Sequence, residues 1–540
     1  MLPSRLNDPA ALLGPAPLEA MRSRRQEWLA RAESLKPVLK INERLPVGLV
    51  SVVNDPKAFQ GCRMEARGAV ESVLGKPLKT GDSFILDFGE HLTGRLAFSL
   101  VEPGEAADAP LRLALVFAER PCELEKPFDP YPGTLVRSWL QDEVFTLDHP
   151  LGFARVPRRC AFRYVKLTVF AVRDGRTAFE KVMVEAQSAV EMDEGAPVPP
   201  GLSPVAAAID LVSRRTLREC MHTVFEDGPK RDRRLWLGDL RLQALANGVS
   251  FRRFDLVKRC LYLFAALPLE DGLVSACVYD EPRVRTGNTR IPDYAALFAS
   301  TVLEYIQESG DRAIAAELWP VAARQAAVLL SLVGDDGLAK VPEKGWWLFF
   351  DWNPELDRQA PLHGAILLCL RRTAMLARIA GVPDEDARVY GDAASKMEAA
   401  ARKDLYDEAK GFFVSGASGQ VSVLSQAWMI LAGACTPGEG EKLLTRVLRE
   451  SGALPPVSPY GWHYLMEACA LCGGEAAGAG RRIMEDYWGG MLDRGADTFW
   501  EVYDPKNEFL SPYGDHRMNS YCHAWSCSPL WFIRGGGFVR

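Results

Sequence analysis

The pattern of hydrophobic and polar residues divides the chain into two long regions. In the first, from about residue 46 to residue 190, short apolar runs are broken by Gly, Pro and Asp, and several runs alternate, as in Leu96, Phe98 and Leu100. An apolar residue at every second position is typical of a strand that buries one face. The series of such strands predicts an antiparallel β-sandwich rather than a parallel sheet.

The second region follows the Pro-rich stretch at residues 191–204, which has the composition of a linker. From there on, apolar residues recur at intervals of three and four, as on one face of a helix. Roughly twelve helices are expected between residues 205 and 527, and several end in Gly, the residue favoured just past a helix. This number of helices, joined by long aromatic-rich connections, predicts an (α/α)6 barrel. A helical solenoid is the competing architecture, but no fixed-period repeat is visible.

These patterns predict an α+β multidomain fold, in which an N-terminal antiparallel β-sandwich is followed by an (α/α)6 barrel. The chain has 540 residues, too many for a single ordinary core. We expect a loosely helical lead-in at residues 1–45 and a β-sandwich accessory domain at 46–195. The (α/α)6 domain, expected at 200–530, would be the catalytic part.

Composition and charge exclude several classes of protein. The formal net charge is −6 and no basic block occurs, so the chain has no electrostatic footprint for nucleic acid. No uninterrupted apolar run approaches the roughly 18 residues of a membrane span, and the N-terminus has no signal-peptide pattern. The twelve scattered cysteines are expected to be free thiols in a reducing cytoplasm. The CxxC pair Cys469 and Cys472 lacks a second pair at zinc spacing, and no metal is expected there.

A charged segment at residues 227–239, DGPKRDRRLWLGD, contains three carboxylates, four basic groups and one Trp. Its early Gly and Pro predict a loop, and Gly238 and Asp239 would open the next helix. Taken alone, the segment also fits a solvated loop in which Asp239 caps that helix.

Far along the chain, a second acidic and aromatic segment, GADTFWEVYDP, places Glu501 between Trp500 and Tyr503. Two carboxyl groups are what glycosidic cleavage requires, one to protonate the leaving oxygen and the other to activate water or attack the sugar. The competing interpretation is a Glu among packing aromatic residues.

Together the two segments resemble those of the glycoside hydrolase family 78 α-L-rhamnosidases. The family's first motif runs approximately D-C-P-x-R-(D)-E-R-x-x-W-x-G-D and its second approximately G-A-T-T-x-W-E, and both have counterparts here in the same order. The resemblance implies an inverting, exo-acting hydrolase that removes terminal α-L-rhamnose from oligosaccharides or glycosides. It also implies a carbohydrate substrate, a rhamnoside, as partner and no cofactor.

The resemblance also implies roles for individual residues. Asp232 stands at the position of the family's general acid and Glu501 at that of its general base. In inverting enzymes these two carboxyls are about 6.5–9.5 Å apart. Further positions are expected to bind the sugar, namely Asp227, Arg231, Trp236, Asp239, Asp293, Asp351, Trp352, Trp500 and His523.

The match departs from the family at the acid, where a Glu is expected and this chain has Asp232. Asp is one methylene shorter, and a displacement of about 1 Å can reduce a rate about a hundredfold. Neighbouring arginines would lower the pKa of Asp232, whereas neighbouring carboxylates would raise it. Glu226 is the fallback acid. Two alternatives therefore remain, an (α/α)6 glycosidase for a different sugar and a catalytically silent carbohydrate-binding relative.

Overall fold

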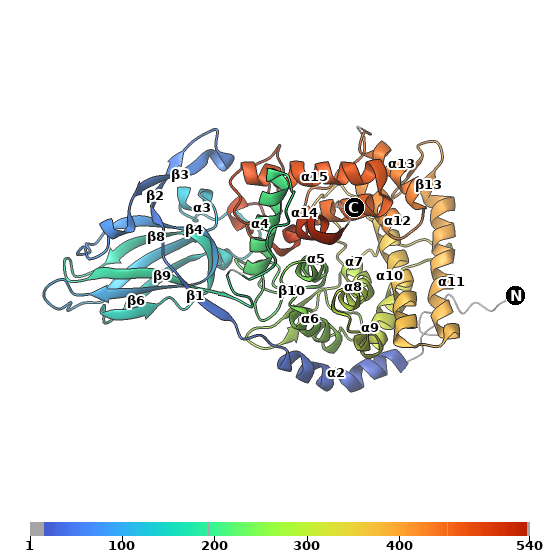
Figure 1. The fold of residues 1–540 in the computed structure, drawn as a ribbon, viewed down its shortest axis with the longest axis horizontal. Coiled ribbons are helices and arrows are strands. Elements are labelled where there is room, and N and C mark those ends of the chain that lie inside the picture. The colour runs from blue at the N-terminus through green and yellow to red at the C-terminus, as the bar shows by residue number, and fades with distance from the viewer. Residues whose placement is uncertain (1–15, 193, 451, 537–540) are drawn as a thin grey trace.

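The structure is a computed structural model that describes residues 16–192, 194–450 and 452–536. It has an N-terminal sheet domain and a C-terminal helical domain (Figure 1). Ahead of the sheet domain in sequence, α2 (Ala16–Ser34) nevertheless packs on the helical domain, against α6 and α9, and buries Trp28 completely. The rest of the expected lead-in that precedes α2, residues 1–15, lies outside the described residues.

The sheet domain contains nine strands in its described residues, and every pairing is antiparallel. The main path runs in the order β1-β9-β4-β8-β5-β6, with β2 and β7 attached to β4 and with β3 attached to β2. The strands are β1 (Lys40–Arg44), β2 (Gly48–Asn54), β3 (Cys62–Gly68), β4 (Ser83–Val101), β5 (Leu111–Ala118), β6 (Asp142–Leu147), β7 (Gly152–Arg155), β8 (Cys160–Ala171) and β9 (Ala178–Ser188).

The longest strand, β4, belongs to two parts of the sheet. Its first half pairs with β2 and β8, and its second half pairs with β7 and β9. Between the halves the register to β8 shifts, and Gly89 there has a φ of 81°, in the left-handed region that glycine tolerates. Such a bulge bends a strand. The sheet therefore curves around one apolar core, to which Leu86, Leu96 and Phe162 belong.

The helical domain begins at α4, and several of its helices have the caps that the sequence indicates. Ser203 and Thr436 accept hydrogen bonds from the first turns of α4 and α13, while Gly310 and Gly381 follow α8 and α10 in the left-handed conformation. The helices are α4 (Pro204–Glu219), α5 (Leu237–Gly248), α6 (Phe254–Ala266), α7 (Pro292–Ala296), α8 (Phe298–Ser309), α9 (Ala313–Leu330), α10 (Gln359–Ala380), α11 (Asp384–Ala400), α12 (Val423–Leu431), α13 (Pro437–Val447), α14 (Pro459–Cys472), α15 (Gly474–Asp493) and α16 (Pro529–Trp531). The prediction of an antiparallel sheet domain followed by a helical domain is confirmed.

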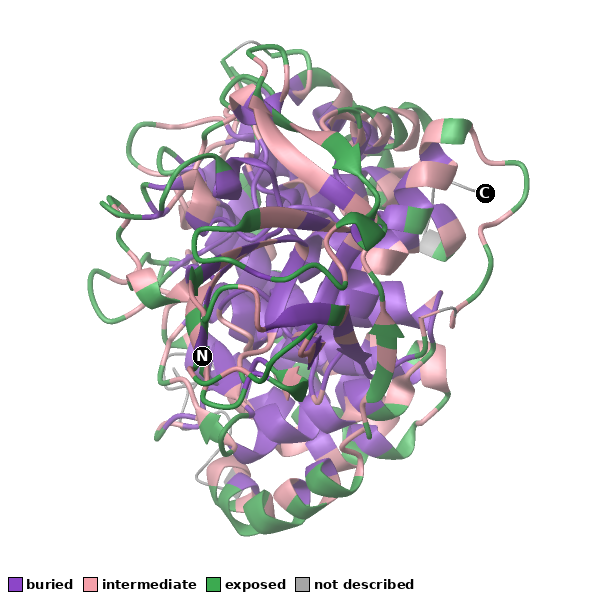
Figure 2. Cartoon of the chain, turned by 90° about the vertical axis from the view of Figure 1, so that its left-hand side faces the viewer, coloured by how far each residue is buried: buried purple, intermediate pink, exposed green. Residues whose placement is uncertain are grey.

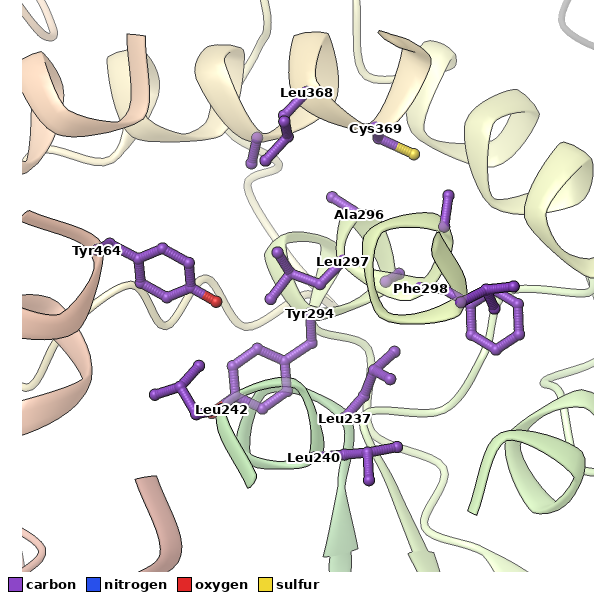
Figure 3. Packing of buried hydrophobic residues seen from close by; sticks show 14 of the residues in the cluster. Leu237, Leu240, Leu242, Tyr294, Ala296, Leu297, Phe298, Leu368, Cys369 and Tyr464 are labelled. Atoms are coloured by element: carbon purple, nitrogen blue, oxygen red, sulfur yellow. The ribbon is translucent and has the colours of Figure 1, made fainter. Parts of the chain in front are cut away.

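Helices from distant parts of the sequence share one core. Going round the domain, α5 contacts α8, α8 contacts α10, α10 contacts α12 and α12 contacts α14. The short helical segment Ala524–Cys527 contacts both α14 and α5, and so completes the circuit. Figure 3 shows side chains of α5, α7, α8, α10 and α14 meeting in this interior, among them Leu240, Leu297 and Tyr464. Figure 2 colours the described residues by burial and shows buried residues inside and exposed ones on the outer loops.

By length and composition, α9 could cross a membrane, and among the described helices it alone meets that test. However, most of α9 is buried, and it packs against α10, α8 and α2. An apolar helix buried on several sides is what the core of a large domain requires.

A buried group of charged residues joins the two domains. Lys230, in the charged segment, donates to Glu123 of the sheet domain and lies 3.5 Å from Glu119. Its ammonium also donates to the carbonyls of Arg517 and Asn519, each at 2.9 Å. Burial alone would raise the pKa of Glu119, but the charge of Lys230 and the hydrogen bonds from His91 and the Tyr521 amide together hold that pKa below its usual value. The loop that carries Asp232 is thus fixed partly by the sheet domain.

Candidate active site

The charged segment and the Glu501 segment meet at one cavity of about 370 Å³. This volume is at the small end of the roughly 300–1,000 Å³ that ligand pockets occupy. Its lining residues come from both domains: Leu135, Val136, Trp139, Asp227, Arg231, Asp232, Arg234, Trp236, Asp239, Tyr294, Trp347, Phe349, Trp352, Glu501, Tyr513, His523 and Trp525.

The loop that carries Asp232 is closed by hydrogen bonds between its two ends. The amide of Asp227 donates to the carbonyl of Arg234 at 3.0 Å, and the amide of Arg234 donates to the Asp227 carboxylate at 3.1 Å. Between these ends, Asp232 and Arg233 both have left-handed backbones, with φ of 55° and 53°. Two adjacent non-glycine residues in that region are uncommon, and such strain is found at functional sites. The turn leaves the Asp232 side chain 20% exposed in the cavity.

The neighbouring arginines mostly bind other groups. Arg233 donates to the carbonyls of Pro229 and Arg159, at 2.9 and 2.6 Å. The guanidinium of Arg234 lies over the ring of Tyr279, 4.4 Å from its centroid. Arg231 and Arg234 each keep a nitrogen 3.8 Å from an oxygen of Asp232, too far for a hydrogen bond. Asp232 therefore retains carboxylate oxygens that a ligand can reach.

Glu501 is buried and held by three donors. Its carboxylate accepts hydrogen bonds from the guanidinium of Arg231, from the hydroxyl of Tyr513 and, at 3.0 Å, from the amide of Ser520. Burial by itself would raise its pKa, but the charge of Arg231 and these hydrogen bonds together hold the pKa of Glu501 below its usual value. Glu501 is thus kept ionised, the form that a general base requires.

Arg231 stands between the two carboxylates of the cavity. One of its terminal nitrogens binds Glu501, the other lies near Asp232, and its Nε donates to the carbonyl of Met518 at 2.9 Å. Its guanidinium also lies over the ring of Tyr513, 4.2 Å from the centroid. The sequence predicted contact with sugar hydroxyls for Arg231. In the structure it lines the cavity, with its Nε and one terminal nitrogen bound to protein groups.

Two further carboxyl groups lie buried in the cavity wall. Burial, together with the charges of Asp232 and Asp239, raises the pKa of Asp227 well above its usual value. Burial likewise raises the pKa of Asp239 and lowers that of His523 to about 4, so that this imidazole is neutral near pH 7. The site therefore contains one carboxylate held ionised, Glu501, and two carboxyl groups, Asp227 and Asp239, that favour the protonated form.

Several polar atoms of the lining have no hydrogen-bond partner among the described residues. They include Oδ1 of Asp239, Nδ1 of His523 and the indole nitrogens of Trp236 and Trp352. Oδ1 of Asp239 and Nδ1 of His523 are 3.7 Å apart, too far for a good hydrogen bond between them. Buried polar groups are nearly always paired, so these atoms are suited to bind the hydroxyls of a ligand.

Three of the residues predicted to bind the sugar lie outside the cavity lining, which corrects that part of the prediction. They are Asp293, Asp351 and Trp500. The carboxylate of Asp293 accepts the amides of Phe349 and Phe350, each at 3.2 Å. That of Asp351 accepts the amides of Val457 and Ser458, at 2.8 and 2.7 Å, and the hydroxyl of Ser458. Both carboxylates bind backbone instead of ligand, because each lies at a loop with unpaired N–H groups.

Trp500 and the fallback acid Glu226 also lie outside the lining. Trp500 is fully buried and stacks on Phe59 of the sheet domain, with 4.8 Å between ring centroids. Both carboxylate oxygens of Glu226 accept from Arg159, at 2.9 and 2.8 Å. In this structure neither side chain lines the cavity in which a sugar would bind. The other predicted positions, Asp227, Arg231, Asp232, Trp236, Asp239, Trp352, Glu501 and His523, all line the cavity.

Sequence reasoning missed several lining residues. Trp347 and Phe349 lie in the same aromatic stretch as Trp352, and that stretch was the signal that could have found them. Tyr513 and the three residues from the sheet domain belong to irregular segments, in which no periodicity marks a functional side chain.

Comparisons with known proteins place the chain in a family. Residues 46–186 match the family model of the glycosyl hydrolase family 78 alpha-rhamnosidase N-terminal domain. Residues 203–534 match that of the bacterial alpha-L-rhamnosidase 6 hairpin glycosidase domain. A search of curated protein sequences found no match.

Solved structures of rhamnosidases are similar over most of the chain. The rhamnosidase from Klebsiella oxytoca with rhamnose bound has 41% identity and a TM-score of 0.90, over 94% of this chain and 98% of that one. The family 78 rhamnosidase of Bacillus sp. GL1 has 23% identity and a TM-score of 0.71, over 88% of this chain and 49% of that one. The Streptomyces avermitilis α-L-rhamnosidase complexed with L-rhamnose has 17% identity and a TM-score of 0.65, over 92% and 44%. The last two likenesses concern the fold alone.

A small cavity that combines an ionised buried carboxylate, further acidic groups and aromatic walls is the site of a glycoside hydrolase. The family matches and the similarity to the Klebsiella enzyme assign the protein to that class. The chain belongs to glycoside hydrolase family 78, the α-L-rhamnosidases.

Proposed function

We propose that this protein is an exo-acting α-L-rhamnosidase that hydrolyses a terminal α-L-rhamnoside with inversion of configuration. The observation that carries the proposal is the pair Asp232 and Glu501, placed in one cavity on either side of the Arg231 guanidinium. Arg231 lies between the two carboxylates and keeps them out of direct contact, which supports inversion, because an inverting enzyme needs room for a water molecule between the base and the sugar.

In this mechanism Glu501 takes a proton from the attacking water. Its lowered pKa keeps it ionised, and Arg231 and Tyr513 orient it. Asp232 protonates the oxygen of the departing group on the other side of the sugar. Among the carboxyl groups of the cavity, Asp232 is the partly exposed one, whereas Asp227 and Asp239 are buried. An acid near the solvent side can reach the leaving oxygen of a glycoside whose terminal sugar occupies the inner cavity.

We also propose the detailed architecture of the two domains, a β-sandwich and an (α/α)6 barrel. The circuit of contacts through α5, α8, α10, α12, α14 and Ala524–Cys527 supports an (α/α)6 barrel whose inner layer surrounds the core. The shared strand β4, which pairs with different strands along its two halves, supports a sheet folded into the two layers of a β-sandwich.

We also keep a cytoplasmic location as a proposal. All twelve cysteines, which the described residues include, are free thiols, and eleven of them are buried. Proteins of reducing compartments retain such thiols. Fractionation of cells that express the chain, with immunodetection of each fraction, would test this location.

A panel of aryl glycosides tests the substrate and the stereochemistry together. We expect release of L-rhamnose from an aryl α-L-rhamnoside, with the β-anomer formed first, because an inverting displacement changes the configuration once. NMR during the first minutes of reaction distinguishes the anomers. Early α-anomer would contradict inversion. Hydrolysis of another glycoside in place of the rhamnoside would indicate a different sugar, and no hydrolysis at all would indicate a silent binding protein.

The role of Asp232 has its own test. In Asp232→Asn, we expect kcat/KM to fall by about 10²–10⁴-fold for a rhamnoside whose alcohol is a poor leaving group. The loss should be much smaller for a dinitrophenyl rhamnoside, because its leaving group needs no proton. Glu226→Gln is the matched comparison, since Glu226 is bound by Arg159 outside the cavity. Equal losses on both substrates would remove Asp232 from the acid role.

A further inference from the structure

One wall of the cavity is built by the sheet domain. Leu135, Val136 and Trp139 line it, and they lie in the connection between β5 and β6. The sequence assigned that domain an accessory role. The structure instead places part of it within reach of whatever occupies the site.

This connection is held firmly against the helical domain. The amide of Thr134 donates to the carbonyl of Tyr513 at 2.8 Å, and Arg517 donates to the carbonyl of Pro127 at 2.9 Å. Leu135 and Trp139 also pack in the apolar cluster that contains Tyr513. Tyr513 is the residue whose hydroxyl binds Glu501. The wall is therefore formed in advance, which reduces the entropy lost when a ligand binds.

Burial differs systematically across the cavity. The polar residues Asp227, Asp239 and Glu501 are almost completely buried. By contrast, Val136 is 68% exposed and Trp347 is 41% exposed, although both line the same cavity. The most deeply buried polar groups thus mark the inner part of the cavity, whereas its solvent side combines the apolar residues Val136 and Trp347 with Asp232, whose side chain is 20% exposed. We use the term rim wall for Leu135, Val136, Trp139 and Trp347.

Aromatic contacts connect the rim wall to the inner site. The ring of Trp347 lies 6.4 Å from that of Trp236 and 6.0 Å from that of Trp352, measured between centroids. Trp352 packs in turn in the cluster that contains Leu135 and Trp139. A continuous apolar surface thus runs from the inner cavity to the solvent.

We infer that the rim wall is the subsite for the leaving group and that it selects a flat aromatic aglycone over a second sugar. This inference rests on the proposed function, because it assumes that the terminal sugar occupies the inner, polar part. The departing group must then extend toward the solvent, along Val136 and Trp347. Leu135 and Val136 have no hydrogen-bonding side-chain group for sugar hydroxyls, whereas an aromatic ring buries apolar surface against them.

The test compares Val136→Ser with the wild type on two substrates, a naphthyl α-L-rhamnoside and a rhamnosyl-glucose disaccharide. We expect kcat/KM for the naphthyl substrate to fall about fivefold, mainly through KM, and that for the disaccharide to change less than twofold. Each substrate is compared only with itself, so that intrinsic leaving-group reactivity cancels. Val136→Ile should retain the wild-type preference.

Val144→Ser is the matched control. Val144 lies on β6 of the same domain, is 59% exposed and is not part of the cavity lining. It should leave both rates unchanged. Equal losses on the two substrates, a larger loss on the disaccharide, or no loss for Val136→Ser would each overturn the assignment of the rim wall. If the wild type releases rhamnose from neither substrate, the proposed function itself fails, and the subsite fails with it.

Discussion

Replacement of Glu501 by Gln is expected to reduce turnover about 10²–10⁴-fold while the protein stays folded. Gln keeps the size of the side chain but cannot accept the proton of the attacking water. The expected result is a fall in kcat on an aryl rhamnoside, measured below the melting temperature of the variant, which should also fall because Gln leaves the buried Arg231 without its ionic partner. Glu450→Gln, at an exposed position, serves as the control. Near-full activity of Glu501→Gln would exclude Glu501 as the base.

A variant that removes only one hydrogen bond from the Glu501 carboxylate is expected to change the pH dependence of activity. Tyr513→Phe removes one hydrogen bond that favours the ionised form of Glu501, and so it should raise the pKa of that carboxyl. A base must be deprotonated to act, so the acidic limb of the kcat/KM profile should move to higher pH. Activity near neutral pH should be largely retained. An unchanged acidic limb would mean that this limb reports another group.

The largest expected effect on stability comes from Lys230. In Lys230→Met, the buried carboxylates of Glu119 and Glu123 lose the ammonium that balances them. Removal of one partner from a buried ion pair costs about 3–5 kcal/mol. We expect a correspondingly lower free energy of unfolding in a denaturant titration, and lower activity, because the Asp232 loop loses its attachment to the sheet domain.

A control and a compensating variant make this test specific. Lys126→Met removes a lysine whose side chain is 75% exposed and which pairs with Glu125 at 3.4 Å, and it should change stability by less than about 0.5 kcal/mol. Adding Glu123→Gln to Lys230→Met should recover part of the lost stability, because one uncompensated charge disappears. Equal effects of the two lysine variants would contradict a role for the buried network.

The parts of the structure that follow a repeating physical constraint could be predicted from the sequence. Apolar residues at every second position in β4 and at every third or fourth position in α10 reflect burial of one face, so sheet and helices were both predicted. Asp232 and Glu501 could be placed in one site because their segments resemble a family pattern, and the structure lines one cavity with both.

The remaining errors concern side chains whose direction the sequence does not encode. Asp351 and Trp352 are adjacent, yet Trp352 lines the cavity while Asp351 turns to the amides of Val457 and Ser458. A carboxylate beside a Trp looks the same in sequence whether it faces a ligand or loop N–H groups. The contribution of Val136 was missed for another reason, because it depends on how two domains pack, which no local pattern expresses.

The left-handed backbone at Asp232 bears on the family departure at this position. Asp and Asn adopt that conformation far more readily than longer side chains, because their short polar groups can bond to nearby backbone. The aspartate found here thus suits the local chain path, and restoring the family's glutamate would conflict with it. Backbone shape and acid identity are thus linked in this loop: a glutamate at position 232 would have to adopt the left-handed conformation that Arg233 also holds, or the path of residues 232 and 233 would have to change.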